Sequence, residues 1–403
     1  MEQALYPERS GNRFPVWGDA RYICGMNDNV INDNGAWCWF QDERAVVDAD
    51  TQTLLVGSIA VKDGPGGENR HGNLELTVVD LQTGAAQIVV LHENFEADDH
   101  DVPAFWKRSD GRWLAMYARH KTDDFMFWRI SEPNDPTIWG EERFFDWSEW
   151  TEGRGVTYAN IHELDGKLYC FARAVNDDQC VMVSEDEGTT WQYAGKLFTR
   201  PKVGYVNGYT RYDSVSDRVD LITTDHHPRD YNNSIYHGYL AGGALRDSDG
   251  TIVDAEIFDA AHEAPSQEKL TTVLPAGTVM AGATLTHAWT SDIRRFDDGT
   301  IIATMTARAD DNPASEEERW ERMRPIVDLR FIYGRYTPEN GWQIHHLAVC
   351  RQALHPPQGG IRQRVHPLRL RERPCRPDHD RPPPARLQLL DLPRLPRRGS
   401  APR

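Results

Sequence analysis

Four segments of this sequence gather histidine, tyrosine and arginine, side chains that can move protons or hold anions. Histidine and tyrosine take and give protons, and the planar arginine guanidinium binds a carboxylate through two parallel hydrogen bonds. Imidazole is also a common metal ligand. Side chains of these types can take part in proton transfer, anion binding or metal binding. The candidate residues in them are His100, His120, Tyr158, Arg173, His226, His227 and His237.

Each candidate also has a purely structural interpretation. His100 lies in an acidic loop and could be a surface residue paired with Asp98 or Asp101. Tyr158 could be a core residue with a satisfied hydroxyl, and Arg173 could form a salt bridge between neighbouring elements. The residue types alone leave these alternatives open.

Further candidates are less distinctive in their surroundings. His120 stands at a predicted strand end and could be a structural hydrogen-bonding group. Arg211 and Arg218 lie close to Tyr209 in the sequence, and we treat all three as candidate substrate contacts. His226 and His237 are candidate metal ligands, although the sequence fixes no third ligand for them.

The elements that must position these residues are short β-strands. Apolar residues alternate with polar ones over short stretches, and turn-forming residues separate the stretches. No long amphipathic helix is predicted, so the chain is expected to be all-β. The predicted strands cover 45–47, 54–60, 74–79, 113–117, 125–130, 168–171, 181–183, 219–223, 234–240, 301–306, 329–335 and 342–349.

Two features of the turns indicate a β-propeller. Asp-Gly pairs at 110–111, 165–166 and 298–299 precede strands, and such pairs supply the positive φ of a tight hairpin. A strand–turn unit that recurs at roughly 50–60 residues is typical of blades with about four strands each. Residues 184–191, SEDEGTTW, match the Asp-box pattern S-x-D-x-G-x-T-W. In it Asp186 is expected to close a hairpin turn, which is a structural role. A β-sandwich is the alternative, but 350 residues of meander is long for one.

The order of several short motifs resembles that of the BNR-repeat polysaccharide lyases, a family that includes ulvan lyases. The resemblance covers roughly residues 30–350 and rests on DHDVPA at 99–104, YAN at 158–160, the Asp-box, TDHHP at 224–228 and NSIYH at 233–237. It implies a propeller that has seven blades in the intact family, with the last blade incomplete in this chain and the active site in a cleft at one end. It also implies cleavage by β-elimination next to a uronate.

The resemblance gives the candidate residues specific roles. His100 matches the catalytic histidine, His120 a second active-site histidine, and Tyr158 the tyrosine that acts as acid or base with it. Arg173 matches the arginine that neutralises the uronate carboxylate. His227 matches a histidine of a Gly-His-Pro motif, whose glycine is replaced here by His226. The resemblance further implies a divalent metal, calcium or zinc, in a structural role, and no organic cofactor.

Two other functions remain open at this point. A sialidase-like glycoside hydrolase shares the Asp-box, but it requires an arginine triad with a Tyr–Glu nucleophile pair, and a hydrolase generally requires two facing carboxylates. No early arginine motif of the sialidase type is visible. A non-catalytic carbohydrate-binding propeller is the other alternative.

The charge and composition of the chain limit the classes of molecule that it is expected to bind. The chain has a net charge of −17, and its acidic part, residues 1–350, is poor in lysine. Such a surface repels phosphates, so nucleic acid is not an expected partner. It resembles a salt-adapted surface, and a halophilic source is our hypothesis. We expect a monomer that binds an acidic polysaccharide or oligosaccharide and no membrane.

The ends of the chain and the cysteines give further expectations about localisation, domain boundaries and thiol state. The N-terminal residues hold no apolar run, so no signal peptide is predicted and the protein is expected in the cytoplasm; a secreted protein would need an incomplete N-terminus. Residues 1–350 are the predicted catalytic domain. Residues 351–403 are rich in arginine and proline, which suits a basic anion-binding tail, a disordered tail or, as we favour, sequence read out of frame. Cys170 and Cys180 could face each other across a hairpin, but we expect them to be buried free thiols.

Overall fold

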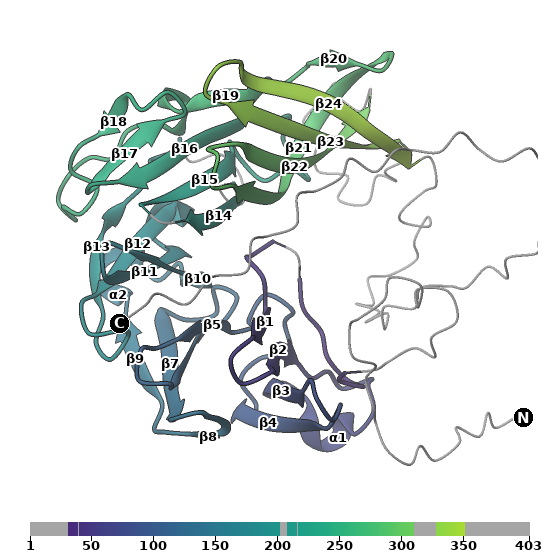
Figure 1. Ribbon diagram of the computed structural model, residues 1–403, viewed down its shortest axis with the longest axis vertical. Helices are drawn as coiled ribbons and strands as arrows, with labels where there is room; N and C mark the ends of the chain where they lie inside the picture. Colours follow the sequence, from purple (N-terminus) through teal and green to yellow (C-terminus); the bar gives the residue numbers. More distant parts are fainter. Residues whose placement is uncertain (1–30, 39, 202–207, 216, 310–327, 351–403) are drawn as a thin grey trace, which may run out of the picture. The chain divides into compact units, whose positions relative to one another are not determined.

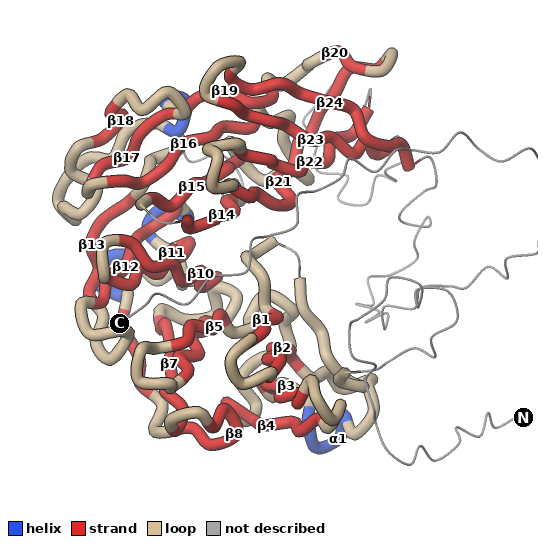
Figure 2. The backbone as a smooth tube through the Cα atoms, viewed as in Figure 1, coloured by secondary structure: helices blue, strands red, loops and turns tan. Residues whose placement is uncertain are grey.

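The structure is a computed structural model that describes residues 31–38, 40–201, 208–215, 217–309 and 328–350. These residues form antiparallel β-sheets joined by loops, with two α-helices of four residues each, α1 Gly67–Arg70 and α2 Ser148–Thr151 (Figures 1 and 2). The all-β prediction is therefore confirmed. The predicted tail, 351–403, lies outside the described residues. No helix in the described part of the chain is long and apolar enough to cross a bilayer.

Five sheets follow one another in chain order, and each is built from consecutive strands, as in the blades of a propeller. We call them blades 1 to 5. The resemblance implies seven blades in the intact family, and the described residues of this chain form five sheets. Blade 1 contains β1 Ala45–Asp48, β2 Thr53–Ile59, β3 Leu74–Asp80 and β4 Ala86–His92. Blade 2 contains β5 Ala104–Lys107, β6 Trp113–Ala118, β7 Phe125–Glu132, β8 Asp135–Trp139 and β9 Arg143–Asp146.

The remaining blades have the same antiparallel order with local additions. In blade 4 the last strand pairs with the third, and blade 5 begins with a two-residue strand. Blade 3 contains β10 Thr157–Leu164, β11 Lys167–Arg173, β12 Gln179–Ser184 and β13 Gln192–Lys196. Blade 4 contains β14 Thr210–Val215, β15 Arg218–Thr224, β16 Ile235–Ala241, β17 Ala244–Asp247, β18 Ile252–Asp254 and β19 Thr271–Leu274. Blade 5 contains β20 Val279–Met280, β21 Ala283–Arg295, β22 Ile301–Ala309, β23 Leu329–Thr337 and β24 Gly341–Cys350.

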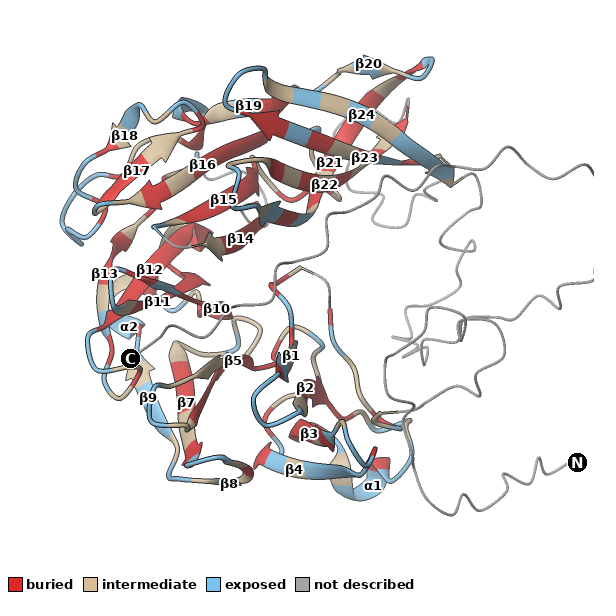
Figure 3. Ribbon diagram, in the orientation of Figure 1, coloured by how far each residue is buried: buried red, intermediate tan, exposed pale blue. Residues whose placement is uncertain are grey.

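Apolar cores lie between consecutive blades, because the inward-facing residues of one sheet pack against the next. Met116 of blade 2 and Met182 of blade 3 belong to one buried cluster. Phe171 of blade 3 packs in a second cluster with Tyr212 of blade 4, and their rings stack 4.4 Å apart. Outer strands such as β4 and β24 are more exposed than the central strands (Figure 3). Burial of apolar surface between sheets therefore holds neighbouring blades together.

The Asp-box forms the β12–β13 turn as predicted. The Asp186 carboxylate accepts hydrogen bonds from the Thr190 amide at 2.8 Å and from the Ser184 hydroxyl at 2.8 Å. Gly188 has a φ of 83°, which a side chain would strain. Trp191 is buried in the cluster between blades 2 and 3. Asp186 is thus a structural residue.

The cysteine prediction is also confirmed for the pair in blade 3. Cys170 and Cys180 are buried free thiols. In the β11–β12 register, Cys170 lies opposite Met182 and Cys180 lies opposite Ala172. The two thiols are therefore not cross-strand partners.

A loop before blade 1 is tied to blade 3. The Arg44 guanidinium donates to the Ala159 carbonyl and to the Asn160 side-chain oxygen at 3.3 Å. The Asn160 oxygen also accepts from the Asp42 amide at 3.0 Å. Asn160 of the YAN motif is therefore a structural residue that holds the segment preceding β1 against the first strand of blade 3.

Candidate active site

The candidate residues come together because they occupy equivalent places in different blades. Each lies at or just before the start of a blade's first strand, or at or just after the end of its second strand, and antiparallel pairing puts these two positions at the same end of the sheet. His100 precedes β5 and His120 follows β6. Tyr158 begins β10 and Arg173 ends β11, while Tyr209 precedes β14.

Asp98 holds the two histidines of blade 2 in one arrangement. One Asp98 oxygen lies 2.5 Å from His100 Nδ1, and the other lies 3.1 Å from His120 Nδ1. The two imidazole rings stack with centroids 3.8 Å apart and planes at 13°. Because an ionised carboxylate only accepts hydrogen bonds, both Nδ1 atoms carry protons. In a neutral His100 this tautomer leaves Nε2 as the atom that can take a proton.

The charges around His100 set its protonation. Burial alone would lower the pKa of His100, but hydrogen bonds to Asp98 and Asp99 outweigh it and raise the pKa. Burial opposes ionisation of Asp98 as well, yet hydrogen bonds from His100 and His120 lower its pKa strongly. The Asp98 carboxylate therefore stays ionised and makes His100 a stronger base.

Tyr158 enters the site through a β-bulge. The β10–β11 register shifts between Thr157 and Asn160, and Tyr158 has a φ of 62°, a value that costs a non-glycine residue conformational energy. The Tyr158 ring lies 5.8 Å from the His100 ring and is buried, with 5% of its surface exposed. Burial raises the pKa of its phenol well above the usual value. The Tyr158 phenol therefore stays protonated at neutral pH.

Arg173 supplies a buried cation between two tyrosines. Its guanidinium carbon lies 4.8 Å from the centre of the Tyr158 ring and 4.7 Å from that of Tyr209. The Nε and Nη2 atoms are buried and make no hydrogen bond within the described part of the chain. Two such donors on one planar group are what a carboxylate can accept. Arg173 is thus suited to bind an anion beside Tyr158.

His227 and Tyr209 form a hydrogen-bonded pair at the blade 4 side. His227 Nδ1 accepts from the Arg229 amide at 3.1 Å, so the Nδ1 atom carries no proton. Burial, with Arg229 nearby, lowers the pKa of His227 well below the usual value, and the ring is neutral. Its Nε2 therefore carries the proton and donates to the Tyr209 hydroxyl at 3.0 Å. The pair fixes the orientation of Tyr209 against Arg173.

Phe40 covers this group of side chains. Its ring stacks on Trp289 of β21 at 4.9 Å and 2°, and it lies 5.3 Å from the His100 ring and 5.1 Å from the Tyr209 ring. Arg173, which contacts the Tyr158 and Tyr209 rings, has 1% of its surface exposed. A large ligand therefore reaches Arg173 only when the surrounding side chains move.

Two predicted substrate contacts are engaged within the protein. Arg211 donates to the Gln41 carbonyl, lies 2.9 Å from a Glu43 oxygen and 3.3 Å from Asp42, and is buried. It joins blade 4 to the segment before blade 1. Arg218 lies at the opposite end of β15 from Thr223, about 17 Å along the strand. The structure therefore does not bring Arg218 to the site.

The predicted metal pair is not brought together either. His237 is fully buried, and its two ring nitrogens lie 2.8 Å from the Ser248 hydroxyl and 3.1 Å from Asp220. The His226 ring lies 5.4 Å from Tyr231 in the loop after β15. Neither histidine belongs to a group of metal-ligating side chains in the described residues. Two groups that can hold a metal both include His100, one with Asp98 and His120 and one with Cys38 and Asp99.

Sequence reasoning missed Cys38, Phe40 and Trp289. Cys38, Tyr158 and Tyr209 form a buried cluster, and Phe40 and Trp289 pack against it. The aromatic stretch around residues 37–40 is a weak signal for a covering segment. Trp289 gives no local signal, because its place depends on a bulge in β21 between Thr286 and Trp289.

Comparison with known proteins supports the fold and the family. A model of BNR repeat-containing family members matches residues 69–310. Two solved structures of an ulvan lyase, a polysaccharide lyase, one of them bound to -[GlcA(1-4)Rha3S]-, each have a TM-score of 0.54 and 13% identity, over 78% of this chain and 73% of theirs. An exo-1,5-α-L-arabinanase from a bovine ruminal metagenomic library is more distant, with a TM-score of 0.39 and 8% identity over 78% of this chain and 97% of its own. No curated protein matches the sequence significantly.

Proposed function

We propose, from the premise that this chain belongs to the BNR repeat-containing family, that it is a carbohydrate-active propeller that cleaves a uronate-containing glycan by β-elimination. The observation that carries the proposal is the convergence, from two blades, of an imidazole, a phenol and a guanidinium that keeps two buried donors without a hydrogen bond. The chemistry needs a base, an acid and a cation, and these three groups supply them.

The cation acts on the carboxylate of the uronate. The C5 proton of a uronate is weakly acidic, and its removal places negative charge on the carboxylate oxygens. Arg173 offers two buried donors that would bind these oxygens and stabilise that charge. Because the guanidinium is already desolvated, it interacts with the charge more strongly than a group in water.

Proton transfer is assigned to the other two groups. His100, held by Asp98, takes the C5 proton at Nε2. The electrons of the C5–H bond form the C4–C5 double bond, and the C4–O4 bond breaks. Tyr158, which keeps its proton to high pH, donates that proton to the departing O4. Atoms and charges balance without any further reactant.

Substrate entry requires a change at Phe40. Arg173 and Tyr158 are almost fully buried, and the Phe40 ring packs against the cluster of Cys38, Tyr158 and Tyr209. A uronate ring can take its place by stacking on Trp289, since sugar faces pack well on aromatic rings. In this proposal the segment before β1 moves when the glycan binds.

One assay separates this function from its alternatives. The protein is incubated with ulvan and with other uronate glycans, and the absorbance of the new C4–C5 double bond is followed. Growth of that absorbance identifies a lyase. New reducing ends without it identify a glycoside hydrolase, and binding without either identifies a non-catalytic sugar-binding propeller.

The assignment of the site has its own test. Replacement His100→Ala is expected to abolish the double-bond signal while the far-ultraviolet circular dichroism stays unchanged. The matched control is His71→Ala, because His71 is exposed and lies outside the site. Full activity of the His100 variant would refute the assignment.

A further inference from the structure

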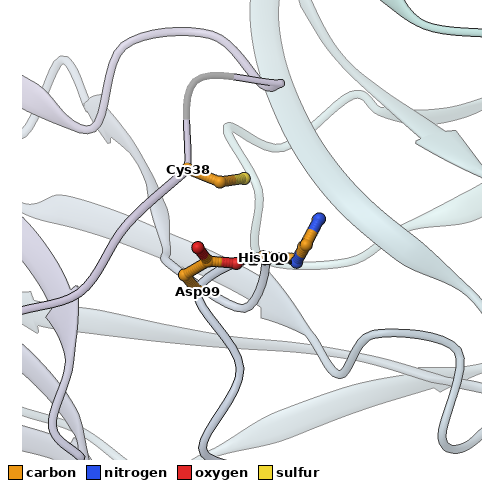
Figure 4. Close-up of side chains that lie close together, drawn as sticks. All are labelled: Cys38, Asp99 and His100. Atoms are coloured by element: carbon orange, nitrogen blue, oxygen red, sulfur yellow. Dashed lines mark ion pairs between the residues drawn. The ribbon is translucent and has the colours of Figure 1, made fainter. Parts of the chain in front are cut away.

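We propose that Cys38, Asp99 and His100 bind a divalent transition metal of the zinc class, and that this metal inhibits the enzyme by occupying its base. The inhibitory part rests on the proposed function, whereas the binding part does not. The three ligand atoms lie within 4.8 Å of one another. Figure 4 shows the thiol, the carboxylate and the imidazole converging from two separate segments.

The ligand types select the metal. Zinc binds thiolate sulfur, imidazole nitrogen and carboxylate oxygen in tetrahedral sites, whereas calcium and magnesium require oxygen ligands. A site with three protein ligands leaves the fourth position to water. Residues Cys38, Asp99 and His100 therefore favour zinc, and cobalt(II) can replace it as a spectroscopic probe.

The surroundings of the thiol favour a cation. Cys38 is buried with Tyr158 and Tyr209, and its sulfur lies within 4.8 Å of ligand atoms of Asp99 and His100. Asp99 and Asp98 bring negative charge to the same place. A divalent ion compensates this charge and displaces the thiol proton and one ring proton of a protonated His100 to solvent, with no change of oxidation state.

The site is reachable and overlaps the proposed base. Asp99 has 48% of its side chain exposed and His100 has 15%, so an ion can enter from the Asp99 side. Asp99 Oδ1 lies 2.9 Å from His100 Nδ1. An ion held between Asp99 and His100 Nδ1 replaces the Nδ1 proton, so the ring keeps its one proton on Nε2 and cannot accept the C5 proton there.

Cobalt(II) tests the binding part without an activity assay. The chelator-treated full chain is titrated with cobalt(II), and the sulfur-to-cobalt charge-transfer band in the near ultraviolet is recorded. The band is expected in the natural protein and in the control Cys350→Ser, and it is expected to be absent in Cys38→Ser. Its absence from the natural protein, or its persistence in Cys38→Ser, would overturn the proposal.

A second variant keeps the test decisive if Cys38→Ser does not fold. Asp99→Asn changes a half-exposed side chain and leaves the thiol in place. It is expected to keep the band but to bind cobalt at least about tenfold more weakly, as is common when a ligand is lost. Unchanged affinity would contradict the assignment of Asp99.

Inhibition is measured separately with zinc. Each protein is compared with its own metal-free rate of double-bond formation. The zinc concentration that halves this rate is expected to be at least about tenfold higher in Asp99→Asn than in the natural protein. Equal sensitivity would refute the inhibitory role. If no glycan yields a double bond, the proposed function fails, and the cobalt band still decides whether the metal binds.

Discussion

The imidazole rings of His100 and His120 stack 3.8 Å apart, and both turn their Nδ1 atoms to the carboxylate of Asp98. This arrangement joins a loop before β5 to the end of β6. One ionised carboxylate thus fixes the orientation and tautomer of two rings at once. Asp98 is therefore a positioning residue that acts through His100.

Replacement Asp98→Asn is expected to lower kcat at least about tenfold, because the general base loses its orientation and part of its basicity. The pKa of His100 is also expected to fall, since Asp98 raises it in the natural protein. The acidic limb of the pH–rate profile should therefore move to lower pH. The measurement is kcat/KM across pH in a chelating buffer.

The matched control for this variant is Asp50→Asn, because Asp50 is almost fully exposed and distant in sequence from the site. Its pH profile should coincide with that of the natural protein. A purely structural role for Asp98 would reduce the rate without moving the acidic limb.

The pH dependence of the natural protein follows from the same groups. A raised pKa keeps His100 protonated, and therefore unable to act as a base, above the ordinary histidine value of about 6.5. Tyr158 stays protonated beyond its ordinary value of about 10. The rate should rise with pH through the neutral range and then stay level into the alkaline range. A maximum below pH 6 would argue against His100 as the base.

Arg173→Lys is expected to lower kcat/KM about 100- to 1000-fold, although it retains the positive charge. Lysine cannot reproduce the planar fork that binds two carboxylate oxygens. The control is Arg294→Lys, a largely exposed arginine in an ion pair with Asp213. Comparable activity of Arg173→Lys and its control would contradict the proposed role of Arg173 in binding the uronate carboxylate.

Much of the fold could be predicted from local sequence patterns. The alternation in 301–306 corresponds to β22, whose residues alternate buried and half-buried along their whole length. The Asp-box predicted the β12–β13 turn because its hydrogen bonds are made within eight residues. Local patterns succeed where both partners of an interaction are close in the sequence.

The site could be predicted only in part from the sequence, because several of its residues come from segments that are far apart in the chain. Cys38, Phe40 and Trp289 reach it from the segment before blade 1 and from blade 5, so no window of sequence contains them together. Arg211 and Arg218 lie on one hairpin, and their types do not tell which end of the strand faces the site. Only the register places Arg218 at the far end.

Salt is expected to stabilise this protein. A net charge of −17 at pH 7 causes repulsion within the folded chain, and ions screen it. The midpoint of thermal unfolding should rise by several degrees between low salt and about 1 M sodium chloride. An equal osmolality of sorbitol, which does not screen charges, is the control. Full stability in the absence of salt would contradict the hypothesis of a salt-adapted surface.

Asp42→Asn should destabilise the fold, because Asp42 joins the segment before blade 1 to two other blades. Its carboxylate lies 3.0 Å from His162 Nε2 and 3.3 Å from Arg211 Nε. Although burial opposes ionisation, these partners lower the pKa of Asp42 in the folded state. Its contribution is therefore present above the unfolded-state pKa of about 3.9 and is lost as the pH falls through the lower folded value. Removal of one member of a buried ion pair costs about 3–5 kcal/mol. Urea unfolding at pH 7 should show this loss in Asp42→Asn but not in the exposed control Asp217→Asn, and the variant should also lose stability less steeply below pH 4.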